Sequence, residues 1–256
     1  MKTVIWLAIG SGVLQLACAT RDGGLRLRPL PKDEQRQEFS LRAVPAEGRR
    51  EQTQFYSATL TKTFEDGQIV HAKEEIVEFT VQVDGEGVDK ATGGIKQVVR
   101  VIEKNGFVDL HELAFPEVGE DLPMAFTANG RVLQAGAYPR DSIFYVPPVS
   151  LPDRPVKIGD TWTMSEQWAS SANGMPMRIE LLTILKAVYI CSQEQRCADL
   201  EISGTVTLPA RVAGLTFASE IRGRMLFGMA KGTVIWGLIR NAEKLSTEAD
   251  EIQVRS

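Results

Sequence analysis

The sequence predicts an all-β protein with few or no helices, built on a long, curved antiparallel sheet that forms a partial or half barrel. Three observations support this fold class. Apolar and polar residues alternate over runs of about ten to fifteen residues, turn-forming dipeptides separate these runs, and a proline-rich stretch divides them into two halves. Period-two alternation is typical of strands with one buried face. Because usual strands are nearer five or six residues, strands this long should curve.

Residues 1–17 are expected to be a signal peptide. Lys2 precedes an apolar run of about twelve residues, which ends in small residues near Ala17. A membrane-spanning helix needs about 20 apolar residues, so this run is too short to cross a bilayer. The remaining chain, with a hydrophobic content of 43% over all 256 residues, is long enough for one large β domain or two small ones.

The end of this leader, Gln15-Leu16-Ala17-Cys18, resembles the lipobox of bacterial lipoproteins, although Gln15 stands where leucine is usual. The resemblance implies that Cys18 is acylated and becomes the mature N-terminus. Ala19, in place of aspartate, then implies an outer-membrane lipoprotein on the periplasmic or the surface face. The alternative is a general secretory leader cleaved near Ala17 or Ala19, which leaves an incidental cysteine.

The lipidated N-terminus and a flexible tether are expected over residues 18–51. Residues 21–50 carry eight basic and five acidic side chains and show no strand or helix periodicity. A flexible chain of this length spans about 30 Å. Its positive charge could favour anionic lipid head groups, or it could simply be a solvated linker. The whole chain has a net charge of −4, which gives no reason to expect nucleic acid as a partner.

A single β domain is expected over residues 52–256, with halves at 52–138 and 160–254 joined by a proline-rich connector. In the first half, Val77, Phe79 and Val81 alternate with polar residues. Turn dipeptides occur in both halves, and tight hairpins prefer them because their central residues need positive φ. They are Asp66-Gly67, Asn105-Gly106, Asn129-Gly130 and Asn173-Gly174, with residues 230–233 as a further candidate.

The second half contains the candidate apolar ligand face. In "GLTFASEIRGRMLFGMA", the residues Phe217, Met225, Phe227 and Met229 point to one side of the predicted strand, and charged residues point to the other. Something must cover such a face: closure into a barrel, a second sheet, a helix or a ligand.

Cys191 and Cys197 are predicted to form a disulfide. Five polar residues separate them, and the segments on either side look like strands. A hairpin loop would place the two sulfurs within bridging reach, and an oxidising compartment would close the bond. A metal site is the weaker interpretation, because two further ligands are missing and the only histidines are His71 and His111. No metal or cofactor is therefore expected.

The connector ends in "LPDRPVKIGDTWT", which resembles the P-V-K-x-G-D-x-W element of uncharacterised secreted and lipid-anchored bacterial β proteins. The later "FGMAKGTVIWG" is similar to a stretch near their last hairpin. The resemblance implies an architecture like the half-barrel of lipoprotein carriers, which hold lipid on their concave face. From the residues themselves, Gly159 and Asp160 should form a turn in which Asp160 accepts a backbone N–H. Trp162 should then open a strand and become buried; a ligand contact is the other interpretation.

A catalytic role is not expected. If "DLHELAF" is a strand, Asp109 and His111 share a face and could act as an acid–base pair, but a surface strand with a solvated histidine is the favoured interpretation. No serine-nucleophile or zinc-helix motif occurs. Three functions follow: binding of an apolar ligand such as a lipid, interaction with an envelope protein or a structural role, and an envelope hydrolase that uses His111. An outer-membrane barrel is disfavoured by the leader and by the charged polar faces.

Overall fold

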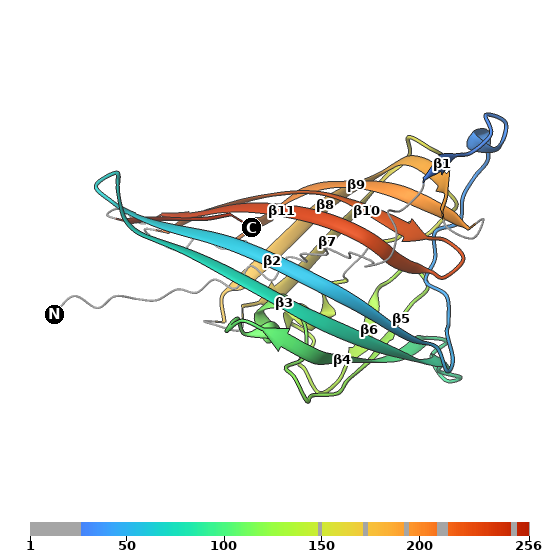
Figure 1. Ribbon diagram of the computed structural model, residues 1–256, viewed down its shortest axis with the longest axis horizontal. Coiled ribbons are helices and arrows are strands. Elements are labelled where there is room, and N and C mark those ends of the chain that lie inside the picture. The colour runs from blue at the N-terminus through green and yellow to red at the C-terminus, as the bar shows by residue number, and fades with distance from the viewer. Residues whose placement is uncertain are drawn as a thin grey trace.

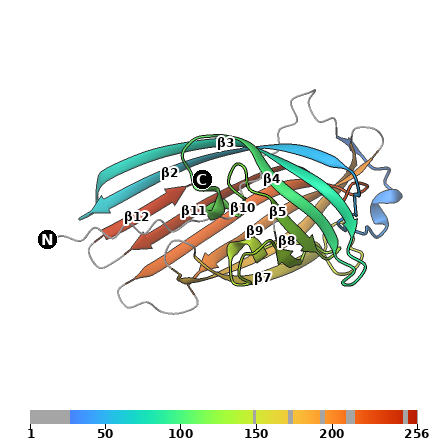
Figure 2. The ribbon, with the colours of Figure 1, turned by 90° about the horizontal axis from the view of Figure 1, so that it is seen from below.

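Eleven of the twelve strands form one continuous antiparallel path in the computed structural model, in the order β1-β8-β9-β10-β11-β12-β2-β3-β4-β5-β6, and β7 also pairs with β8. The structure describes residues 27–147, 150–170, 174–191, 195–208, 215–246 and 250–255. The predicted fold class is confirmed, because the sheet is antiparallel and curved and does not close into a barrel (Figures 1 and 2). The two predicted halves belong to the same sheet, since β12 pairs with β2.

Seven of the twelve described strands have 11 to 21 residues, as the alternation predicts. Their bounds are β1 Arg28–Pro29, β2 Arg50–Glu65, β3 Gln68–Val88, β4 Ile95–Asn105, β5 Leu122–Phe126, β6 Val132–Ala135, β7 Thr161–Ala169, β8 Pro176–Ile190, β9 Arg196–Thr207, β10 Thr216–Gly228, β11 Thr233–Ser246 and β12 Asp250–Arg255. The described helices are three short 3₁₀ turns, η1 Glu34–Arg36, η2 Leu110–Leu113 and η3 Ile143–Tyr145. None of the described helices is long and apolar enough to cross a membrane.

Bulges and glycines produce the curvature of the sheet. Register shifts interrupt several ladders, for example between Thr80 and Val81 in the pairing of β3 with β4, and such bulges bend a strand and increase its twist. A Cβ atom on Gly204 of β9 would lie 2.1 Å from the carbonyl oxygen of Glu180 on β8. Only glycine therefore allows these two strands to approach as closely as they do.

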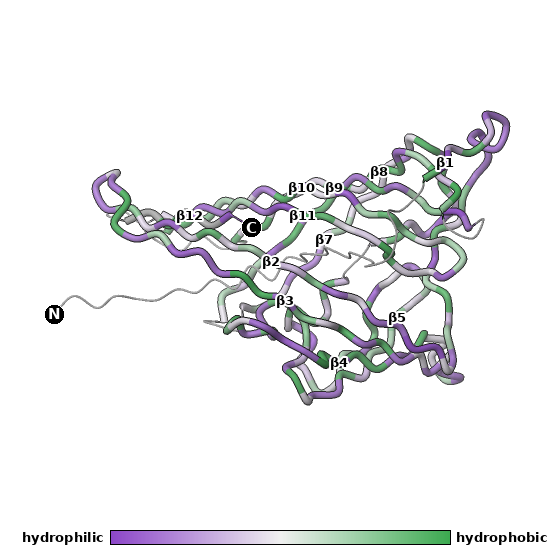
Figure 3. The backbone as a smooth tube through the Cα atoms, in the orientation of Figure 1, coloured by the Kyte–Doolittle hydropathy of each residue, from purple (hydrophilic) through white to green (hydrophobic). Residues whose placement is uncertain are grey.

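Two hydrophobic clusters fill the inner face of the sheet. The main core joins buried side chains of both halves, including Phe55 and Phe79 on β2 and β3 and Met225 on β10. The second core lies between the ends of β8, β9 and β10 and the N-terminal segment, and it includes Leu185 and Phe227. Hydrophobic and hydrophilic residues alternate along most strands, as Figure 3 shows.

The N-terminal segment 27–49 packs on the end of this sheet, which differs from the flexible tether expected over 18–51. Leu30, Phe39 and Leu41 are buried in the second core. Phe39 also forms a two-hydrogen-bond bridge with Val156, with N···O distances of 2.7 and 2.9 Å. In Figure 1 the segment runs along one end of the molecule, from β1 to the start of β2.

The turn dipeptides have mixed outcomes. Asp66 and Gly67 both adopt positive φ and form the predicted hairpin between β2 and β3. Residues 229–232 likewise connect β10 to β11. Asn105-Gly106, predicted as another hairpin, instead ends β4, and the chain continues into η2. The predicted turn at Asn173 lies outside the described residues.

Candidate functional site

The disulfide between Cys191 and Cys197 is present, as predicted. It closes the hairpin between β8 and β9, where the two Cα atoms lie 6.0 Å apart. Both cysteines are buried. Close by, Arg196 donates to Glu34 of η1 at 2.6 Å, so this hairpin also contacts the N-terminal segment. Cys18, the predicted lipidation site, lies outside the described residues.

The turn before β7 has the structure that the sequence analysis derived from its residues. Gly159 has a φ of +96°, and the Asp160 carboxylate accepts a hydrogen bond from the Lys157 N–H at 3.0 Å. Trp162 lies on β7 and is half-buried against the second core, not fully buried as predicted, while its indole N–H donates to the Ser150 carbonyl at 2.9 Å. Each group has a partner within the fold, so this element is a structural turn.

The candidate apolar ligand face is divided between the two cores. Met225 belongs to the main core and is 1% exposed, and Phe227 belongs to the second core and is 2% exposed. Phe217 packs at the margin of the main core and Met229 at the margin of the second. A ligand could reach Met225 or Phe227 only by displacing side chains that already fill the inner face.

His111 lies on a 3₁₀ turn, so the prediction of a strand at "DLHELAF" is wrong. The Asp109 carboxylate accepts a hydrogen bond from the His111 N–H and begins the 3₁₀ turn η2, which ends at Ala114 in the left-handed conformation. The His111 side chain therefore contacts two loops, the one before β5 and the one after β6. Its Nε2 atom lies 2.8 Å from the Glu120 carboxylate and 3.0 Å from the Tyr138 hydroxyl.

The surroundings of His111 are acidic. The pKa of Glu120 is lowered, first by its hydrogen bond with His111 and next by the hydrogen bond that it accepts from the Glu117 N–H. Burial, followed by the charges of Glu120 and Asp109, raises the pKa of Tyr138. These contacts fasten η2 to the connection that leads into β5 and to the connection after β6. Among the described residues, no cluster of three or more histidine, cysteine or acidic side chains could hold a metal ion.

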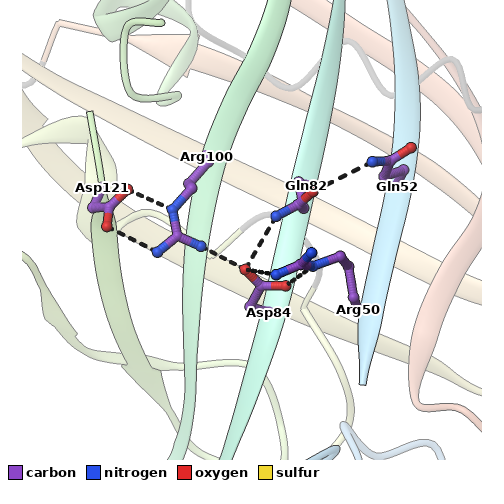
Figure 4. A network of polar contacts seen from close by, with 6 residues as sticks. All are labelled: Arg50, Gln52, Gln82, Asp84, Arg100 and Asp121. Carbon is purple, nitrogen blue, oxygen red and sulfur yellow. Dashed lines mark hydrogen bonds and ion pairs between the residues drawn. The ribbon is translucent and has the colours of Figure 1, made fainter. Parts of the chain in front are cut away.

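A network of charged and amide side chains crosses the outer face of β2, β3 and β4 and reaches Asp121, the residue before β5 (Figure 4). Asp84 accepts from Arg50 at 2.6 Å and from Arg100 at 2.5 Å. Arg100 also donates two hydrogen bonds to Asp121. The hydrogen bond from Arg50 is the largest cause of the lowered pKa of Asp84. Two cations and two anions compensate each other here, so the network joins strands and leaves no net charge for a ligand.

Unpaired strand edges are the feature that the sequence analysis missed. β12 is short and pairs with only the last residues of β11 and β2, Ala242–Ser246 and Leu60–Glu65. Over the rest of their length, β11 and β2 have a sheet partner on one side only, as far as the described residues show. Exposed apolar side chains stand on the outer face of these two strands, including Tyr56, Leu60 and Leu238. These edges could not be predicted from the sequence, because alternation shows that a segment is a strand but does not identify the strands that pair with it.

No family model matches the chain, and no curated protein and no solved structure matches it either.

Proposed function

We propose that this protein is a non-catalytic lipoprotein of the bacterial outer membrane that binds a partner protein through its curved sheet. The observation that carries the proposal is the contrast between the two faces of the sheet. Met225 and Phe227, which would line an apolar ligand site, are buried in filled cores, whereas Tyr56 and Leu238 are 46% and 42% exposed on the outer face. Exposed apolar residues beside unpaired strand edges are typical of surfaces that bind other polypeptides.

Attachment to the membrane follows from the leader. A cysteine at position 18 behind a lipobox-like stretch, followed by alanine, supports acylation at Cys18 and an outer-membrane location. The Cys191–Cys197 disulfide supports an oxidising compartment. A hydrolase that uses His111 has less support, because the Nε2 atom of His111 is already engaged by Glu120 and Tyr138.

Purification of the protein from its own cell envelope in mild detergent tests this function. We expect a mature chain that begins at an acylated Cys18, together with a stoichiometric protein partner. The variant Leu238→Lys should lose the partner. Leu182→Lys should retain it, because Leu182 is a similarly exposed leucine, at 38%, on the distant strand β8. A stoichiometric lipid besides the anchor, with no protein partner, would instead establish the apolar-ligand function.

A further inference from the structure

β11 and β2 both pair with β12, but each does so over only part of its length. β12 lies between β11 and β2 and is antiparallel to both. Beyond Arg255, nine residues of β11 (Thr233–Asn241) and ten of β2 (Arg50–Thr59) have no partner on that side among the described residues. Figure 2 shows β12 as a short strand beside β2 and β11 at one end of the sheet. We call these two unpaired segments the edge pair.

One added strand would satisfy both segments of the edge pair. Because β11 and β2 are each antiparallel to β12, they are parallel to each other, and a strand in line with β12 would be antiparallel to both. Arg255 stands opposite Leu60 and Ala242. Continued in that register, successive positions of an added strand would stand between Ala58 and Arg240, then between Ser57 and Ile239, then between Tyr56 and Leu238.

The far end of the edge pair is held together by polar contacts. Arg49 donates to the Lys231 carbonyl at 3.1 Å, and the Lys231 ammonium lies 3.7 Å from the Glu51 carboxylate. β12 joins the strands at one end and these contacts join them at the other. The length left between them suits a segment of about nine residues.

The middle of the edge pair lacks the charges that usually protect a strand edge, and its charged residues, Arg50, Glu51 and Arg240, lie towards its ends. Gln52–Thr59 and Thr233–Ile239 contain no charged residue. In contrast, Gln68–Val77 of β3 pairs only with β2 in the described structure and carries Lys73, Glu74 and Glu75, with an ion pair of 2.7 Å between Lys73 and Glu75. Charged side chains deter the addition of foreign strands. The β3 edge is therefore protected and the middle of the edge pair is not.

We infer that the edge pair binds an extended segment of a partner protein as an added β-strand in line with β12. This inference rests on the proposed function and identifies its binding site. Main-chain hydrogen bonds to both edges would hold the segment, and alternate side chains would select it.

The flanking residues define the chemistry of that segment. At the outward position between Ala58 and Arg240, an acidic residue fits, because Arg240 makes no ion pair within the described part of the chain. At the next outward position, between Tyr56 and Leu238, a large apolar residue fits. The inward position between them faces Ser57 and Ile239, which are both buried, so only a small residue fits there. The partner segment therefore carries an acidic, a small and an apolar residue at three successive positions.

A synthetic peptide tests the inference directly. The probe is acetyl-Thr-Asp-Ala-Leu-Val-Thr-Val-Thr-Lys-amide with a fluorescent label, titrated against the purified full chain and followed by anisotropy. We expect saturable binding that Leu238→Lys weakens about tenfold and that Leu182→Lys leaves unchanged. Replacing the peptide's aspartate by lysine should weaken binding, and Arg240→Glu should restore it. A peptide with proline at its third and seventh positions should not bind, because it cannot complete the ladder.

Amide hydrogen exchange supplies a second measurement that needs no variant. The peptide should slow exchange in Glu51–Thr59 and Thr233–Asn241 and leave Gln68–Val77 unchanged. The inference is overturned if both runs of the edge pair are already as protected in the free chain as the centre of β9, or if Leu238→Lys and Leu182→Lys bind the peptide equally. A partner protein that co-purifies while the peptide does not bind would refute this site alone. Peptide binding without any partner protein in the cell envelope would refute the proposed function.

Discussion

Replacing Phe39 by alanine tests whether the N-terminal segment is an integral part of the fold. Phe39 is 2% exposed and packs in the second core with Leu151, Val156 and Leu185. The change removes about 150 Å² of buried apolar surface, which at about 25 cal/mol/Å² corresponds to about 4 kcal/mol. Measured costs of Phe→Ala in protein cores are similar, at about 3–5 kcal/mol. We therefore expect the free energy of unfolding to fall by about 3–4 kcal/mol.

Equilibrium urea unfolding, monitored by tryptophan fluorescence, measures this loss. Phe107→Ala is the matched control, because Phe107 is fully exposed and its replacement should change stability by less than about 0.5 kcal/mol. The slope of the transition should be the same for both variants, since the same surface is exposed on unfolding. A loss below about 1 kcal/mol for Phe39→Ala would show that residues 27–49 are a tether after all, and the packing described for this segment would be refuted.

Three further predictions concern the disulfide, the turn before β7 and two carboxylates. Removing the Cys191–Cys197 bond by a double serine substitution should lower the free energy of unfolding in urea by about 2 kcal/mol, because the closed loop is short. The wild-type protein with reductant should lose the same amount. Asp160→Ala should cost about 1 kcal/mol through loss of its backbone hydrogen bond, whereas Asp160→Asn, which keeps an acceptor, should cost less. Burial, followed by the charges of Asp109 and Glu75, raises the pKa of Glu112. Its ionised form therefore reduces stability above that pKa, and Glu112→Gln should stabilise the protein at pH 7 but not below pH about 4. Burial alone would raise the pKa of Glu117. Hydrogen bonds from Lys104 and the Leu110 N–H outweigh burial, so this pKa is lowered. Glu117→Gln should accordingly destabilise at pH 7, and the loss should vanish as the pH falls through the lowered pKa. Thermal unfolding of both variants across this pH range measures the two effects. If both variants changed stability in the same direction, the opposite pKa shifts of the two carboxylates would be contradicted.

Local pattern predicted the strands and the turn before β7 because both depend on residues close in the sequence. The alternation around Val77 and Phe79 fixes which face of β3 is buried. The turn at Asp160 needs only a glycine and a short acceptor side chain. The Cys191–Cys197 pairing was predictable for the same reason, since both cysteines flank one hairpin.

The remaining features depend on contacts between distant parts of the chain. Leu30, Phe39 and Leu41 are isolated apolar residues in a charged stretch, and only the end of a sheet that folds elsewhere in the chain gives them a place to pack. His111 was misplaced because the capping hydrogen bond that the Asp109 carboxylate accepts from the His111 N–H overrides the weak alternation in "DLHELAF". The edge pair required knowing that β12 is shorter than both of its neighbours.

Packing of Phe39 should also influence the edge pair. Phe39 anchors the segment whose later residues contact the turn before β11, at the far end of the edge pair. A Cβ on Gly232 of this turn would lie 2.3 Å from the Val44 nitrogen, and Arg49, the residue before β2, donates to the Lys231 carbonyl. Loosening this anchor should let the two strands separate further and so reduce the fraction of molecules able to accept one added strand along both edges. We expect Phe39→Ala to weaken peptide binding about fivefold in the absence of urea, while Phe107→Ala leaves it unchanged. Equal affinities in the two variants, with both chains folded by circular dichroism, would show that the N-terminal segment and the edge pair are independent.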